Sequence, residues 1–225
     1  MVCLCSSLFF LGLYQFNNKY SQNTIQAANG ILALSEEELQ KSPVRFLVSG
    51  WAFYPDALLT PEEIRDESHY MRYLSIGEQT NFSSPANPSP YGCGTYQMTF
   101  FLPERKETYA LEIPEVFSAY NLYLDHDLIL QMGEPAQRTP LVQNRMVTFH
   151  GGKPVTLTIA VSNYDHFYGG IVYPPAFGTM LAVNTTRGIR FAFCLFSCTV
   201  TFVCALLSFY FSHRMKQKNA FLFGL

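Results

Sequence analysis

The chain has 225 residues and a net charge of −2, so it lacks the basic excess typical of nucleic-acid-binding proteins. Only 14% of its residues are charged, below the roughly 25% usual for soluble domains. The charge deficit is not spread evenly along the chain, so we expect membrane-associated segments, and the charge balance indicates no nucleic-acid partner.

The first 16 residues form an apolar run, and the more polar residues 17–29 follow it. A run of this length is short for a membrane span but fits the apolar core of a signal sequence. We therefore expect residues 1–16 to be a signal peptide or signal anchor, and residues 17–29 to be a linker.

Residues 30–183 carry mainly the period-two alternation of half-buried strands. In GTYQMTFFLP, for example, Tyr96, Met98 and Phe100 share one face. Turn residues recur at intervals of roughly 8–15 residues, which indicates an all-β antiparallel sandwich of the jelly-roll type. Only Cys93 lies in this region, so we expect the domain to be held together by burial and not by an internal disulfide.

Two short flanking helices are predicted within this β region. Ser35 precedes Glu38 by three residues, and Thr60 precedes Glu63 by the same spacing, with Pro61 between them. Both patterns are capping boxes, which mark the first turn of a helix.

The segment YLDHDLIL predicts a β-hairpin with Asp125, His126 and Asp127 at its tip. These side chains could bind a metal only with convergent ligands from elsewhere, and no partner at a suitable spacing is visible. The chain also contains no HExxH and no GxSxG motif. We therefore predict no metal, no cofactor and no catalytic residues in this chain.

The stretch VSNYDHFYGGIVYPPAFG ends a predicted strand with a sharp change of direction. Asn163 can bond to its own backbone, and Gly169 and Gly170 permit left-handed dihedrals or a close backbone approach. We expect these three residues to form a structural corner. Aromatic side chains at an exposed rim could stack on a sugar ring or a partner, whereas in a core they only pack. The candidate ligand-binding residues are Trp51, Tyr54, Tyr164, His166 and Tyr168, of which Trp51 fits a core position equally well.

Residues 191–211 contain no charge, and about 20 apolar residues suffice to cross a ~30 Å hydrocarbon core. We predict that they form a transmembrane helix. The basic residues that follow, Arg214, Lys216 and Lys218, place residues 212–225 in the cytoplasm and residues 17–190 outside. Residues 184–190 would link the β region to the span, with Gly188 as a hinge. KNAFLFGL, at the end of the chain, is expected to start a second span.

Several motifs occur in order along the β region: SGWAFYPDALLTPE, GTYQMTFFLP, YALEIPEVFSAYNLYLDHDLI, MGEP and VSNYDHFYGGIVYPPAFG. Together they resemble the extracellular jelly-roll sensor domain of bacterial seven-transmembrane receptors with diverse intracellular signalling modules. The resemblance covers residues 30–183, and the apolar span with KNAFLFGL resembles the start of that family's membrane region.

The β region is also similar to the sugar-binding jelly roll, with its galactose-binding-like fold, of family 2 glycoside hydrolases. In that domain a strand ends in an Asn-Gly hairpin, and an N…GGI segment follows. Asn163 and Gly169-Gly170-Ile171 match the second feature, while Asp125-His126 replaces the Asn-Gly turn. The domain is accessory in those enzymes, so the resemblance does not imply hydrolysis.

The first resemblance implies an extracellular domain that binds a carbohydrate or other small molecule and passes the signal through a membrane to an output domain. The expected partners are that ligand and the lipid bilayer, with a homodimer also considered. Two alternatives stay open: an anchored carbohydrate-binding or adhesive module without signalling output, and a glycosidase fragment.

Overall fold

The computed structural model describes residues 11–12, 18–20, 24–66, 68–77, 82, 89–104, 107–137 and 139–215. These residues divide into a β-domain, which ends at Val183, and a helical part that begins at Asn184. The predicted signal segment, residues 1–16, lies outside the described residues apart from positions 11 and 12. The predicted start of a second span, after Met215, lies outside them as well.

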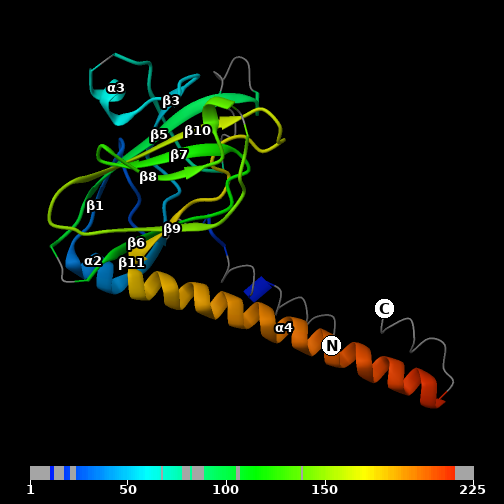
Figure 1. The fold of residues 1–225 in the computed structure, drawn as a ribbon. Coiled ribbons are helices and arrows are strands. Elements are labelled where there is room, and N and C mark those ends of the chain that lie inside the picture. Colours follow the sequence, from blue (N-terminus) through cyan, green and yellow to red (C-terminus); the bar gives the residue numbers. More distant parts are fainter. Residues whose placement is uncertain are drawn as a thin grey trace. The chain divides into compact units, whose positions relative to one another are not determined.

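Among the described residues, the strands form a seven-stranded and a four-stranded sheet. The larger sheet consists of β1 (Ile31–Ala33), β3 (Trp51–Pro55), β4 (Arg72–Leu74), β5 (Gly92–Phe101), β7 (Ala119–Leu124), β8 (Asp127–Met132) and β10 (Val155–Asn163). The smaller sheet consists of β2 (Val44–Phe46), β6 (Tyr109–Ile113), β9 (Arg145–Phe149) and β11 (Ala176–Thr179). Figure 1 shows the two sheets as separate layers.

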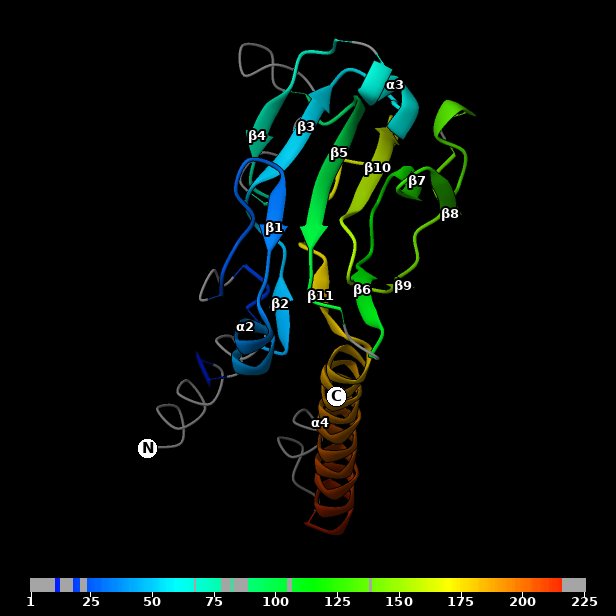
Figure 2. The same cartoon turned by 90° about the vertical axis from the view of Figure 1, so that its left-hand side faces the viewer.

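Among the strands that the structure describes, the pairing is antiparallel except between β1 and β5, which confirms the predicted antiparallel β structure. The larger sheet has the order β4-β3-β5-β10-β7-β8, and the smaller one has the order β2-β11-β6-β9. In the larger sheet, β5 pairs with β3 through its first half and with β1, in parallel, through its last residues. Figure 2 shows β3, β5 and β10 side by side in this sheet.

The core lies between the two sheets and is rich in aromatic side chains. Tyr96, Met98 and Phe100 alternate inward along β5, as predicted, and all three are buried. The ring of Phe100 lies 5.1 Å from that of Phe177 in β11 and 5.6 Å from that of Phe149 in β9. These contacts join the sheets, and burying each ring contributes about 1.5–3 kcal/mol.

Both predicted short helices are present. Helix α2 (Glu36–Lys41) begins with a capping box, in which Ser35 N–H donates to Glu38 over 2.6 Å. Helix α3 (Pro61–Asp66) begins with the equivalent contact, a 2.7 Å hydrogen bond from Thr60 N–H to Glu63. A 3₁₀ turn, η1 (Pro135–Gln137), follows β8. The predicted hairpin joins β7 to β8, and Asp125 occupies the left-handed region with a φ of 54°.

Helix α4 (Met180–Met215) is long and apolar enough to cross a membrane. Its 36 residues extend over about 54 Å. Three hydroxyl groups within the apolar part are paired inside the helix, because Thr199, Thr201 and Ser208 each donate to the carbonyl four residues earlier. Such internal pairing suits a segment that lipid surrounds.

The helix begins earlier than predicted. We expected a helix from Phe191 with a separate link before it, but residues 184–190, including Gly188, are helical. β11 ends at Thr179, and the Thr179 hydroxyl accepts the Ala182 N–H over 3.3 Å. An N-terminal cap of this kind starts the helix directly after the strand.

Candidate functional site

The outward face of the larger sheet carries a row of polar side chains. Alternation along β5 and β10 brings Gln97 opposite Thr158 and Thr99 opposite Thr156. The Gln97 amide donates to the Thr158 hydroxyl over 3.3 Å, and the hydroxyls of Thr99 and Thr156 lie 3.1 Å apart. These hydrogen bonds hold the four side chains in fixed positions, as a polar floor.

Helix α3 forms one wall above this floor. The chain before it is fastened to the sheet, because the Thr95 hydroxyl accepts the Leu59 N–H over 2.9 Å and donates to the Ala57 carbonyl over 2.8 Å. Thr95 is fully buried under this segment. The helix itself presents Pro61 and Ile64 to the floor.

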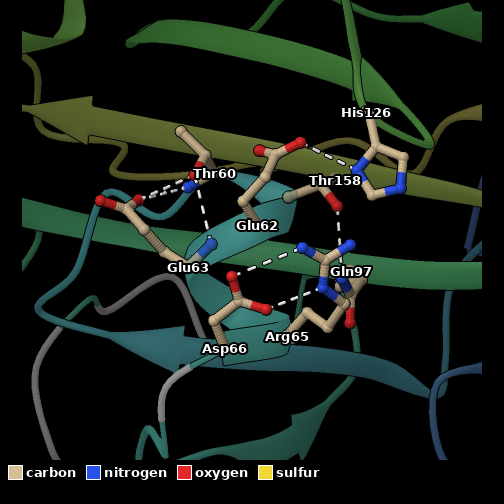
Figure 3. Close-up of polar contacts among 8 residues, drawn as sticks. All are labelled: Thr60, Glu62, Glu63, Arg65, Asp66, Gln97, His126 and Thr158. Atoms are coloured by element: carbon tan, nitrogen blue, oxygen red, sulfur yellow. Dashed lines mark hydrogen bonds and ion pairs between the residues drawn. The ribbon is translucent and has the colours of Figure 1, made fainter.

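The tip of the β7–β8 hairpin forms the opposite wall. The Asp125 carboxylate accepts the Thr156 N–H over 2.8 Å, which fixes the tip to the start of β10. His126 Nδ1 lies 2.8 Å from a carboxylate oxygen of Glu62 on α3, so the two walls are in contact (Figure 3). This contact joins segments that are 64 residues apart in the chain.

The polar floor and the two walls border a cavity of about 540 Å³ that is open to solvent, which we call the outer cleft. This volume falls in the range of roughly 300–1,000 Å³ found for small-molecule sites. Its lining residues are Pro61, Ile64, Arg65, Gln97, Thr99, Asp125, His126 and Thr156. The cleft therefore offers hydroxyl, amide, imidazole, carboxylate and guanidinium groups beside a small apolar surface.

The charged groups at the rim are paired with one another. Glu62 accepts a hydrogen bond from its own backbone N–H and contacts His126, and both interactions lower the pKa of Glu62. Arg65 forms a 2.7 Å ion pair with the neighbouring Asp66, which lowers the pKa of Asp66 and raises that of Arg65. These pairs are solvent-exposed and contribute little to stability.

Two of the candidate ligand-binding residues lie on β3, on opposite faces of the sheet. Trp51 is 0% exposed, and its indole N–H donates to the Leu47 carbonyl over 2.9 Å, so it packs in the core away from the outer cleft. Tyr54 is half-buried on the outward face. Its hydroxyl lies 3.5 Å from the Gln97 side chain, which places it beside the floor of the cleft.

The other three candidates lie in the chain after β10, at a second surface. The rings of Phe117 and His166 stack with their centroids 4.6 Å apart, and Tyr168 lies against both. Phe167, which contacts Tyr168, is 75% exposed. We call Phe117, His166, Phe167 and Tyr168 the aromatic corner. Tyr164 is half-buried in the same loop.

Asn163 holds this loop in shape. Its side-chain amide donates to the carbonyls of Pro90 and His166, and its oxygen accepts the His166 N–H over 3.1 Å. A Cβ on Gly169 would collide with the Pro90 carbonyl, and Gly170 has a φ of +75°. Close approach and backbone conformation therefore require glycine at both positions.

None of the residues that line the outer cleft is among the predicted ligand-binding residues. The alternation that places Tyr96 and Met98 in the core also places Gln97 and Thr99 on the outward face, so this part of the signal was present. The position of α3 over that face could not be predicted from the sequence, because it depends on the hydrogen bonds of the buried Thr95 hydroxyl. His126 was interpreted as a turn residue, and its contact with Glu62 depends on the same arrangement.

Comparisons with protein-family models and with curated proteins find no match. Several solved structures are similar over part of their length. A glycosyl hydrolase family 2 member from Bacteroides cellulosilyticus DSM 14838 has a TM-score of 0.49 and 12% identity, over 61% of this chain and 20% of that one. The Ruminococcus gnavus β-glucuronidase has a TM-score of 0.43 and 12% identity, over 68% of this chain and 30% of that one. The GH2 β-galacturonidase from Eisenbergiella tayi has a TM-score of 0.43 and 14% identity, over 60% of this chain and 24% of that one.

This chain thus spans about a third or less of the length of these three structures. The identities and TM-scores are too low to transfer an activity or a binding site to it.

Proposed function

We propose that the β-domain is a jelly-roll module that binds a carbohydrate or a similar polyhydroxylated small molecule in the outer cleft, as the sensor domain of a membrane receptor. The observation that carries the proposal is the cavity of about 540 Å³ with a floor of hydrogen-bonded polar side chains.

The side chains of the cleft match the chemistry of a sugar. Each sugar hydroxyl donates and accepts, and the Thr99 and Thr156 hydroxyls and the Gln97 amide do the same. Because these groups are already held by one another, a ligand meets positioned partners and the entropic cost of binding is smaller. Pro61 and Ile64 supply an apolar surface for the C–H face of a ring.

The membrane part of the proposal depends on α4. A helix of this length and hydropathy would hold the β-domain at a bilayer surface. The connection favours a sensor over a passive anchor, because no loop separates β11 from α4. The first helical N–H, that of Met180, donates to the Thr108 carbonyl in the β-domain over 2.8 Å. A ligand that favours one of two states of this connection would shift the membrane part with it.

Calorimetric titration of the full chain with glucose, galactose, mannose, N-acetylglucosamine and their disaccharides tests the binding proposal. A polyoxyethylene detergent is needed, since maltoside detergents carry sugars themselves. Thr99→Val keeps the strand geometry but removes a hydroxyl of the floor, and should weaken binding of a responding sugar about five- to tenfold. Thr148→Val is the matched control, on an exposed position of β9. Equal affinities of both variants, or no sugar response, would refute the proposal.

Cross-linking in membranes tests the sensor role. Cys194, Cys198 and Cys204 of α4 carry exposed thiols, and oxidation would link neighbouring copies once the other cysteines are replaced. A cross-linking yield that changes on addition of a saturating sugar supports a sensor. A yield that does not change supports an anchored module without signalling output.

A further inference from the structure

A second cavity lies between α2 and residues 24–25, on a different part of the β-domain. It has a volume of about 340 Å³, and its lining residues are Thr24, Ile25, Ser35, Glu37, Glu38, Lys41, Ser42 and Arg45. None of these residues lines the outer cleft.

Arg45 is a buried cation at this cavity. It lies on β2 opposite Phe177, and paired residues of neighbouring strands point to the same face, so its side chain enters the inner side of the sheet. Only 2% of its surface is exposed. One terminal nitrogen donates to the carbonyls of Glu38 and Ser42, each over 3.0 Å, at the end of α2.

These two carbonyls leave the guanidinium incompletely satisfied. Its Nε–H is buried and has no hydrogen-bond partner. Among the residues that the structure describes, no carboxylate lies within ion-pair distance of Arg45. A guanidinium stays charged in proteins, and a buried charge without a directly paired carboxylate is costly. Burial accordingly lowers the pKa of Arg45, with the nearby charge of Glu38 opposing the effect.

Several other groups of the cavity can bind an anion, although two carboxylates also line it. Lys41 supplies a second cation, and Thr24, Ser35 and Ser42 supply hydroxyls. Of the two carboxylates, that of Glu38 is engaged by the backbone N–H and the hydroxyl of Ser35, over 2.6 and 3.0 Å. Glu37 is exposed.

We propose that this cavity is a binding site for a phosphate group, held by Arg45 and Lys41. A phosphate offers several acceptor oxygens and up to two negative charges, which match one buried and one exposed cation. The group can come from a free phosphate or from a phospholipid headgroup. The second source suits the position of the site, since β2 pairs with β11, at Gly178, just before α4 begins. The site is independent of carbohydrate binding in the outer cleft.

Titration of the full chain with inorganic phosphate, in a phosphate-free polyoxyethylene detergent and at constant ionic strength, tests the proposal. Because Arg45 is part of the packed interior, the informative variants are the exposed Lys41→Met and Glu37→Gln. Lys41→Met should weaken phosphate binding about three- to tenfold, and Glu37→Gln should strengthen it. Lys153→Met, on an exposed position that does not line the cavity, is the control and should bind as the wild type does.

Saturable phosphate binding that is weakened by Lys41→Met and strengthened by Glu37→Gln supports the site. No response, or equal losses in Lys41→Met and Lys153→Met, would overturn it. Nanodiscs then identify the source of the phosphate group. If phosphatidylglycerol discs abolish the response to free phosphate, a lipid headgroup fills the site, whereas a response that persists in them identifies a free phosphate.

Discussion

Replacing Phe100 with alanine tests the register that creates both the core and the outer cleft. Phe100 is 0% exposed, and its ring contacts Phe149 and Phe177 in the other sheet. Phe→Ala in a core costs about 3–5 kcal/mol, because transfer free energy is lost and a cavity remains. For a domain of this size, each kcal/mol lowers the Tm by about 2–4 °C, so a fall of about 6–20 °C is expected.

The next residue provides the control. Phe101 has the same side chain on the opposite face and is 44% exposed. Phe101→Ala should therefore cost about 1 kcal/mol or less. Trp51 is the single tryptophan of the chain and lies in the same core, so its fluorescence reports unfolding of the β-domain in the full-length protein. A larger loss of stability for Phe101→Ala than for Phe100→Ala would refute the register of β5, because a slip of one residue exchanges the two faces of the strand.

Three further predictions concern the corner, the cleft and the second sheet. Asn163→Ala removes three hydrogen bonds and leaves half-buried partners unsatisfied, so thermal denaturation should show a loss of stability of about 1–3 kcal/mol. The pKa of Glu62 is lowered first by the hydrogen bond from its own backbone N–H and then by His126, so its charged form makes a small, solvent-screened contribution to stability above the ordinary carboxyl pKa, and this contribution is lost as the pH falls. The small Tm difference between the wild type and Glu62→Gln should accordingly shrink as the pH falls below the ordinary carboxyl pKa, and a difference that grows in acid would contradict this contribution. Gly178→Ala would push a Cβ into the Pro43 carbonyl, and urea denaturation should show a loss of about 1–3 kcal/mol.

Local patterns in the sequence predicted the elements that depend on local chemistry. The alternation of β5 placed Phe100 in the core, and the two capping boxes marked α2 and α3. Trp51 shares its face of β3 with Phe53, and both are buried, so the structure places it in the core position that the sequence left open beside a ligand-binding role. The apolar run of residues 191–211 likewise predicted a helix. The earlier start of α4 depends on the Thr179 cap, and residues 184–190 carry no apolar periodicity that would predict a helix there.

Features that depend on distant pairing could not be predicted. The parallel pairing of β1 with the end of β5 joins segments that are far apart in the chain. The outer cleft combines β5, β10, α3 and the β7–β8 tip, and only the order of strands in the sheet brings these together. The burial of Arg45 likewise follows from the pairing of β2 with β11, because the sequence around it shows only a short strand pattern.

Chemical modification of histidines tests most directly where the β-domain binds its ligand. His126 lines the outer cleft and its side chain is 59% exposed, while His166 belongs to the aromatic corner. Diethyl pyrocarbonate labelling of the full chain, followed by peptide mass spectrometry, reports both residues in one sample. With a saturating sugar, we predict slower labelling of His126 and unchanged labelling of His166. Protection of His166 with unchanged labelling of His126 would contradict binding in the outer cleft.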